Sequence, residues 1–136
     1  YSGDVHKKQE DSFKKNEEEK VNILNKLKDI AINIKDCLLT NELESIGNLL
    51  HESWQIKKSL DQHISTPNVD RLYEIGRKNG AYGGKLLGAG NGGYLLFYYN
   101  PKKRNQLVGS LTDGGAEILD FNFEFNGTKI WNASTI

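Results

Sequence analysis

The sequence predicts an α+β domain in which helices pack on one face of an antiparallel sheet. Apolar residues recur every three or four positions through the first two thirds of the chain, which is the period of amphipathic helices. In the last third they alternate with polar residues around a glycine-rich turn, which is the period of half-buried strands. The 136 residues, 37% of them hydrophobic, supply one core and are too few for two. We therefore expect residues 1–136 to form a single domain.

The first helix is expected over residues 7–39, a stretch without Gly or Pro. The polar stretch before Val21 is expected to fray or to project. An apolar stripe follows it, widened by Ile23, Ile30 and Cys37, and its main positions are Val21, Leu24, Leu27, Ala31, Ile34 and Leu38.

Two further helices follow. Asn41 and Glu44 have the spacing of a capping box and predict the start of the second, which should lie antiparallel to the first because the connection is so short. Thr66 and Pro67 predict the start of the third, which should end near Asn79 and Gly80. The predicted inward positions of the two helices are Leu43, Ile46, Leu50, Trp54 and Leu60, and then Val69, Leu72, Tyr73 and Ile75.

The remaining residues predict strands and one more helix. Residues 85–87 and 94–99 are the expected arms of a hairpin, and Asn100-Pro101 predicts a helix that ends at Gly114-Gly115. Residues 119–125 alternate between apolar and polar types, as in a half-buried strand. Asn126-Gly127 predicts a two-residue turn, after which residues 128–131 should pair back.

Half of the chain's 14 glycines lie within residues 80–93. A backbone without side chains can approach a ligand closely and direct its N–H groups at a phosphate. The motif G-x-G-x-x-G is present, but it leads into a strand instead of a helix, so a dinucleotide-binding site is excluded. Leu86 follows Gly84-Lys85 where a P-loop needs Ser or Thr, and the protein-kinase motifs are missing after Gly93. A phosphate-contacting hairpin of another lineage remains, beside the alternative of a plain tight turn.

Composition excludes several classes of function. Eighteen basic residues balance eighteen acidic ones, which disfavours nucleic acid and anionic membranes as partners. Three scattered histidines and one cysteine give no metal-binding spacing. Cys37 alone indicates a reducing compartment, and we expect a cytoplasmic protein. The chain lacks methionine and begins with Tyr1, so we expect it to be a piece of a longer protein.

Residues 80–93 resemble the third, C-terminal glycine motif of the GHMP kinases, a family of small-molecule kinases. Residues 49–54, Lys57-Lys58, residues 64–67 and Asp70 resemble the branch that phosphorylates D-glycero-D-manno-heptose 7-phosphate. The resemblance covers nearly the whole chain and implies the C-terminal domain of such a kinase, with a ferredoxin-like antiparallel sheet and helices packed on one face of it.

The resemblance implies transfer of the γ-phosphoryl group of ATP to the anomeric hydroxyl of heptose 7-phosphate, with Mg²⁺. The catalytic residues and the metal ligands are expected in an N-terminal domain outside this chain, so the chain alone should be inactive. The C-terminal motif would shape the ATP loop and supply N–H groups to it. The residues implied in that support are Gly84, Lys85, Gly88, Ala89, Gly90, Asn91, Gly92 and Gly93.

Three other residues are candidates for substrate contacts. Lys57 or Lys58 would meet the heptose phosphate, or both form a solvated helix face. His6 stands where the family has an arginine, which weakens any anion contact there. Asn91 replaces a family glycine and narrows the space for phosphate. Another GHMP kinase and a non-catalytic binding module stay open as alternatives. If the family's topology holds, most of the first strand is missing, and the sheet edge or domain face that this exposes predicts weak homodimerisation or low stability.

Overall fold

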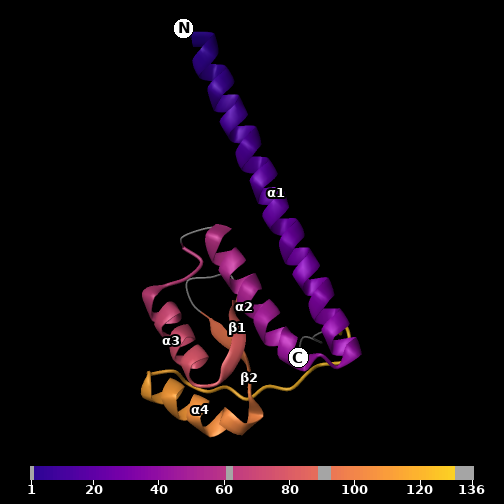
Figure 1. Cartoon of the computed structure of the whole chain (residues 1–136), viewed down its shortest axis with the longest axis vertical. Helices are drawn as coiled ribbons and strands as arrows, with labels where there is room; N and C mark the ends of the chain where they lie inside the picture. The colour runs from indigo at the N-terminus through magenta and orange to yellow at the C-terminus, as the bar shows by residue number, and fades with distance from the viewer. Residues whose placement is uncertain (1, 61–62, 89–92, 131–136) are drawn as a thin grey trace, which may run out of the picture.

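The computed structural model describes the backbone of residues 2–60, 63–88 and 93–130, with side chains from residue 17 onward. Three helices precede a two-stranded hairpin, and a short 3₁₀ turn and one more helix follow it (Figure 1). In order, the elements are α1 (Ser2–Thr40), α2 (Leu43–Leu60), α3 (Pro67–Lys78), β1 (Ala81–Leu87), β2 (Tyr94–Tyr99), η1 (Pro101–Lys103) and α4 (Arg104–Asp113).

Helix α1 packs against α2 through its C-terminal part, and its N-terminal part projects far from the body (Figure 1). The polar stretch before Val21 is helical, so it projects without interrupting the helix. Ile30 is the buried centre of the contact face, whereas Val21, Leu24 and Leu38 are 55%, 58% and 60% exposed. The prediction therefore centred the buried apolar stripe of α1 on the wrong residues. Two overlapping stripes run along α1, and only contact with α2 decides which one is buried.

Asn41 ends α1 and does not cap α2, contrary to the prediction. Its φ of 62° is left-handed, a conformation that asparagine tolerates better than most residues. The Glu42 N–H donates to the Cys37 carbonyl at 2.9 Å, which is the 6→1 bond of a Schellman motif. The left-handed turn at Asn41 thus brings the Glu42 N–H to a carbonyl of the first helix.

The predicted start and end of α3 and the hairpin arms are confirmed. The Thr66 hydroxyl accepts from the Val69 N–H at 3.2 Å, Pro67 is the first helical residue, and Asn79 is the C-cap. Strand β1 begins at Ala81, earlier than predicted, and pairs antiparallel with β2 through Gly84 opposite Phe97 and Leu86 opposite Leu95. The helix after Asn100 ends at Gly114, as expected.

The core lies where α2, α3 and α4 meet the hairpin. Trp54, Val69, Tyr73 and Leu86 form one buried cluster. Ala81, Leu107 and Leu111 form a second, and the Phe97 ring contacts both. These contacts confirm an α+β domain with helices packed on the hairpin.

The strand predicted over residues 119–125 is absent. Residues 116–130 are neither helix nor strand, and Phe121, Phe123 and Phe125 are 60%, 77% and 92% exposed. A strand needs a partner for its backbone N–H and C=O groups. Among the described residues β2 pairs with β1 only, so residues 119–125 have none, and the sheet contains two strands. The return strand proposed for residues 128–131 is likewise absent over residues 128–130, and Trp131 lies outside the described residues.

Candidate functional site

The glycine-rich turn joins β1 to β2 at the end of the hairpin remote from α4 (Figure 1). Gly88 and Gly93 stand at its two ends with φ of 102° and 130°, where side-chain-bearing residues are strained. A Cβ on Gly93 would also lie 2.5 Å from the Leu87 carbonyl oxygen. The backbone conformation and the lack of space both require glycine at position 93. Ala89, Gly90, Asn91 and Gly92 lie outside the described residues.

Lys57 reaches this turn from the last turn of α2. Its Nζ donates to the Gly88 carbonyl at 3.4 Å, across 31 positions of sequence. The contact is exposed, so the ammonium is accessible from solvent beside the glycines. Lys57 therefore brings a positive charge to the entrance of the turn, which is consistent with a role in binding an anion.

Lys58, its neighbour, faces a different set of groups. Its Nζ lies 3.1 Å from Asp70 Oδ1 and 5.6 Å from the centre of the Trp54 ring. The Ser65 hydroxyl donates to the same carboxylate oxygen at 2.9 Å. Lys58 thus links α2 to the start of α3, and these contacts give it a structural task whether or not it also meets substrate.

Gly84 and Lys85 lie in β1 before the turn. Lys85 pairs with Leu96 and is half-buried, on the sheet face opposite to Leu86. The Gly84 carbonyl accepts a hydrogen bond from the Tyr73 hydroxyl at 3.3 Å. His51 Nδ1 lies 2.8 Å from the same hydroxyl oxygen. A chain of polar contacts therefore connects α2, α3 and the strand that leads into the glycines.

Burial keeps both side chains of this connection, His51 and Tyr73, in their neutral forms. Burial lowers the pKa of His51, and the Arg77 cation lowers it further. Burial also raises the pKa of Tyr73, so both side chains are neutral near pH 7. The Tyr73 hydroxyl lies within hydrogen-bond distance of both the Gly84 carbonyl and His51 Nδ1, and the tautomer of the neutral imidazole sets which group donates between the two rings. Sequence reasoning missed the connection because 22 residues separate its two side chains.

Other predicted features lie apart from the turn or beyond the described side chains. His6 belongs to the first turns of α1, where side chains are not described. Among the described residues, no three His, Cys, Asp or Glu side chains are placed to hold a metal ion. No helix in that part of the chain is both long and apolar enough to span a bilayer.

Comparison with known proteins places these features in a family. The family described as GHMP kinases C terminal matches residues 34–116, from the end of α1 to the end of α4. D-glycero-alpha-D-manno-heptose 7-phosphate kinase of Campylobacter jejuni is 32% identical over 85% of this chain and 34% of its own length. Mevalonate kinase of Methanocaldococcus jannaschii is 35% identical over 54% of this chain and 23% of its own length.

A solved structure supports the same assignment. Mevalonate kinase from methicillin-resistant Staphylococcus aureus MRSA252 superimposes with a TM-score of 0.57 at 27% identity, over 65% of this chain and 30% of that one. The chain spans about a third or less of these relatives. The matched region contains the helices, the hairpin and the glycine turn described above. The chain belongs to the GHMP kinase family and corresponds to its C-terminal domain.

Proposed function

We propose that this chain is the C-terminal part of an ATP-dependent kinase that phosphorylates the anomeric hydroxyl of D-glycero-D-manno-heptose 7-phosphate. The observation that carries the proposal is the hairpin turn bounded by Gly88 and Gly93, with the Lys57 ammonium at its entrance. The similarity to a heptose 7-phosphate kinase over 85% of the chain supports the choice of acceptor.

The residues of the turn suit contact with a phosphate-bearing loop. Only glycine fits at Gly93, so backbone can approach a ligand there without a side chain between them. Lys57 adds a cation, and phosphoryl transfer depends chiefly on alignment and on neutralising negative charge. ATP supplies the transferred group when bound. This chain positions and neutralises it, and Mg²⁺ would be held by residues of the ATP-binding half.

The Tyr73 and His51 contacts hold the strand that carries the turn. Tyr73 fixes the Gly84 carbonyl from one side, and Lys57 fixes the Gly88 carbonyl from another. Both contacts lie on the β1 side of the turn, and they attach the segment from Gly84 to Gly88 to α3 and α2. A strand held in this way presents the entrance of the turn in one position, which lowers the cost of ordering that entrance on binding.

The test is an ATP-dependent phosphorylation assay on a polypeptide in which this chain follows an ATP-binding half. Acceptors would include heptose 7-phosphate, other sugars and sugar phosphates, and mevalonate. We expect heptose 7-phosphate to have the highest kcat/KM. A better acceptor of another class would overturn the assignment of the substrate but not that of the family. Ligand binding without turnover of any acceptor would favour a non-catalytic module.

A matched pair of variants tests the turn itself. Gly93→Ala introduces both backbone strain and a contact with the Leu87 carbonyl, and we expect kcat/KM to fall by at least about tenfold. Gly127→Ala is the control, because nothing lies within 4 Å of that position. Equal activity of the two variants would remove the turn from the mechanism.

A further inference from the structure

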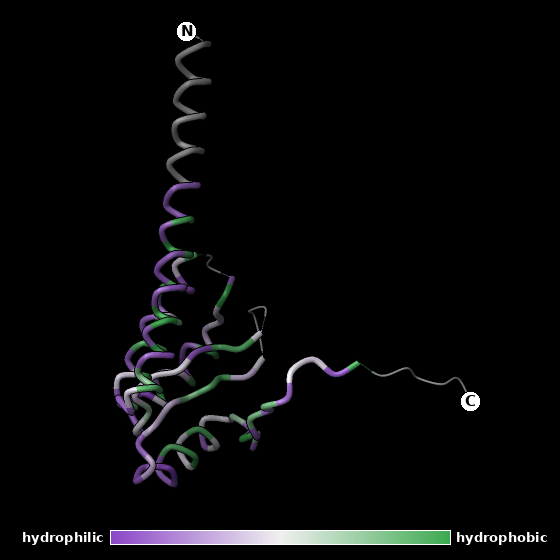
Figure 2. The backbone as a smooth tube through the Cα atoms, turned by 90° about the vertical axis from the view of Figure 1, so that its right-hand side faces the viewer, coloured by the Kyte–Doolittle hydropathy of each residue, from purple (hydrophilic) through white to green (hydrophobic). Residues whose placement is uncertain are grey.

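The last turn of α2 carries two neighbouring lysines that have different contacts. Lys57 Nζ donates to the Gly88 carbonyl of the glycine turn at 3.4 Å. Lys58 Nζ lies 3.1 Å from Oδ1 of Asp70, in the first turn of α3. Figure 1 shows the end of α2, the start of α3 and the turn end of the hairpin at the same end of the domain, and the view at right angles in Figure 2 agrees. The ion pair therefore lies beside the residue that approaches the turn.

Lys57 belongs to the part of α2 where a helix loses its own hydrogen bonds. The last carbonyl groups of a helix have no N–H donor within the helix, and helix ends open at little cost in free energy. The bond from Lys57 to Gly88 is itself exposed and long, so it holds the end of α2 only weakly. A further contact between the last turn and the rest of the domain would decide how often the ammonium lies beside Gly88.

The start of α3 is a firm point for such a contact. The Thr66 hydroxyl accepts from the Val69 N–H at 3.2 Å, and Pro67 has the backbone dihedral of a first helical residue. The Asp70 carboxylate also accepts a hydrogen bond from the Ser65 hydroxyl at 2.9 Å. The position of the carboxylate is therefore set by α3 and does not depend on the lysine.

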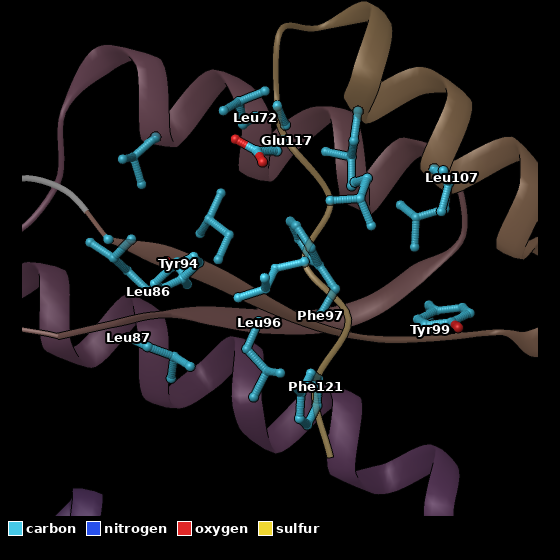
Figure 3. Close-up of a pocket in the computed structure, with 18 of the residues that line it drawn as sticks. Leu72, Leu86, Leu87, Tyr94, Leu96, Phe97, Tyr99, Leu107, Glu117 and Phe121 are labelled. Atoms are coloured by element: carbon cyan, nitrogen blue, oxygen red, sulfur yellow. The ribbon is translucent and has the colours of Figure 1, made fainter.

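The strand that leads to the turn is fixed to the same helix. Leu86 of β1 is buried in a cluster that includes two side chains of α3. Figure 3 shows Leu86 and Phe97 of the hairpin and Leu72 of α3 lining one apolar space. Because α3 holds both this strand and the carboxylate, a bond from α2 to the carboxylate also fixes the end of α2 relative to Gly88.

We propose that Asp70 is a positioning residue: through Lys58 it keeps the Lys57 ammonium at the entrance of the glycine turn, where it would meet the phosphate groups of ATP. Lys58 is suited to this role because its side chain is only 28% exposed and its Nζ also lies 5.6 Å from the centre of the Trp54 ring. The two lysines then have different tasks, since one faces the ligand and the other acts through it. The inference rests on the proposed function.

The kinase assay described above tests the proposal with four variants. Asp70→Asn keeps an oxygen for the Ser65 hydroxyl and removes the charge that holds Lys58, so KM for ATP should rise about two- to fivefold with kcat within about twofold of the parent. Lys58→Met breaks the same pair and should have the same effect, whereas Lys58→Arg keeps the pair and should leave KM near that of the parent. Asp36→Asn is the control, because it removes a carboxylate from the exposed pair with Lys35 in α1.

A double-mutant cycle separates positioning from general loosening of the domain. In a Lys57→Met background, Asp70→Asn should raise KM for ATP no further, because the group that it positions is gone. Effects of the two changes that simply add would overturn the proposal, as would an unchanged KM in Asp70→Asn. A rise in KM for the sugar phosphate in Lys58→Met that Asp70→Asn does not share would also overturn it, since Lys58 would then meet the substrate directly.

The contact can also be followed without any reaction. In the ¹³C-labelled chain of 136 residues, the resonance of the Gly88 carbonyl reports its bond to Lys57. Lys57→Met and Asp70→Asn should shift this resonance in the same direction, and Asp36→Asn should not. These shifts without phosphorylation of any acceptor would support the role of Asp70 and overturn the kinase reaction. A shift in Lys57→Met alone would overturn the role of Asp70 even in an active kinase.

Discussion

The neutral state of His51 ties the stability of the domain to pH. Burial and the Arg77 cation hold the pKa of the folded imidazole below its ordinary 6.5, while the unfolded chain keeps the ordinary value. Below pH 6.5 the unfolded state therefore binds more protons than the folded one, and protonation favours unfolding. The contribution is complete above pH 6.5 and is lost as the pH falls from there through the lowered pKa. Urea unfolding across this range should show stability rising with pH.

A variant separates this effect from that of the other titrating groups. His51→Gln keeps a donor near Tyr73 but does not titrate, so the stability of the variant should depend less steeply on pH in the same range. Parallel stability curves for the parent and His51→Gln would show that His51 is not the group responsible. Tyr73→Phe removes the bond to the Gly84 carbonyl and should cost about 1 kcal/mol at neutral pH.

Substitution of Lys57 tests function with little effect on the free energy of unfolding. Its bond to the Gly88 carbonyl is exposed and long, so Lys57→Met should change the free energy of unfolding by less than about 0.5 kcal/mol. In the kinase assay the same change should raise KM for ATP about three- to tenfold, because the turn loses both an attachment and a nearby cation. Lys57→Arg should recover most of the loss. An unchanged KM in Lys57→Met would assign Lys57 to the helix surface.

At the scale of the elements, two glycines set how closely α2 approaches β1. A Cβ on Gly47 would lie 3.0 Å from the Tyr82 carbonyl carbon and closer still to Tyr82 Cβ, and a Cβ on Gly83 would meet the Gly47 carbonyl. Gly47→Ala therefore forces the helix away from the strand. We expect a loss of about 1–3 kcal/mol in thermal or urea unfolding.

Gly109 in α4 is the control for this change. Nothing lies within 4 Å of the site where its Cβ would be, so Gly109→Ala should stabilise the domain by about 0.4–1 kcal/mol through the unfolded chain and helix propensity. If Gly47→Ala were also neutral or stabilising, α2 and β1 would not be in close contact.

The elements that sequence predicted well are those with local signals. Thr66 and Pro67 at the start of α3, and the glycine turn between β1 and β2, are set by residues within a few positions of one another. The buried side of α1 and the fate of residues 119–125 depend instead on distant partners. The same holds for the site, where the glycines were recognisable but the contacts of Lys57 with Gly88 and of His51 with Tyr73 were not.

At the scale of the whole molecule, the surface carries both charged and large apolar side chains. The chain carries equal numbers of acidic and basic residues, and its exposed large apolar side chains include Leu119, Phe121, Phe123 and Phe125. Self-association of the chain can therefore use charge pairs or the apolar side chains of residues 119–125. Salt distinguishes them, because exposed charge pairs are screened within about 8 Å at physiological ionic strength and apolar contacts are not.

We expect apolar contacts to hold the weak homodimer that the sequence predicts. Its dissociation constant should change by less than about threefold when sodium chloride is raised well above physiological concentration, with any change toward tighter binding. Sedimentation equilibrium in buffers of increasing salt measures it. Phe123→Lys provides the comparison, because it places a charge among the exposed apolar side chains and should weaken the association. A parent dimer that dissociates steadily with added salt, and that Phe123→Lys leaves unchanged, would place the contact on charged surfaces instead of on residues 119–125.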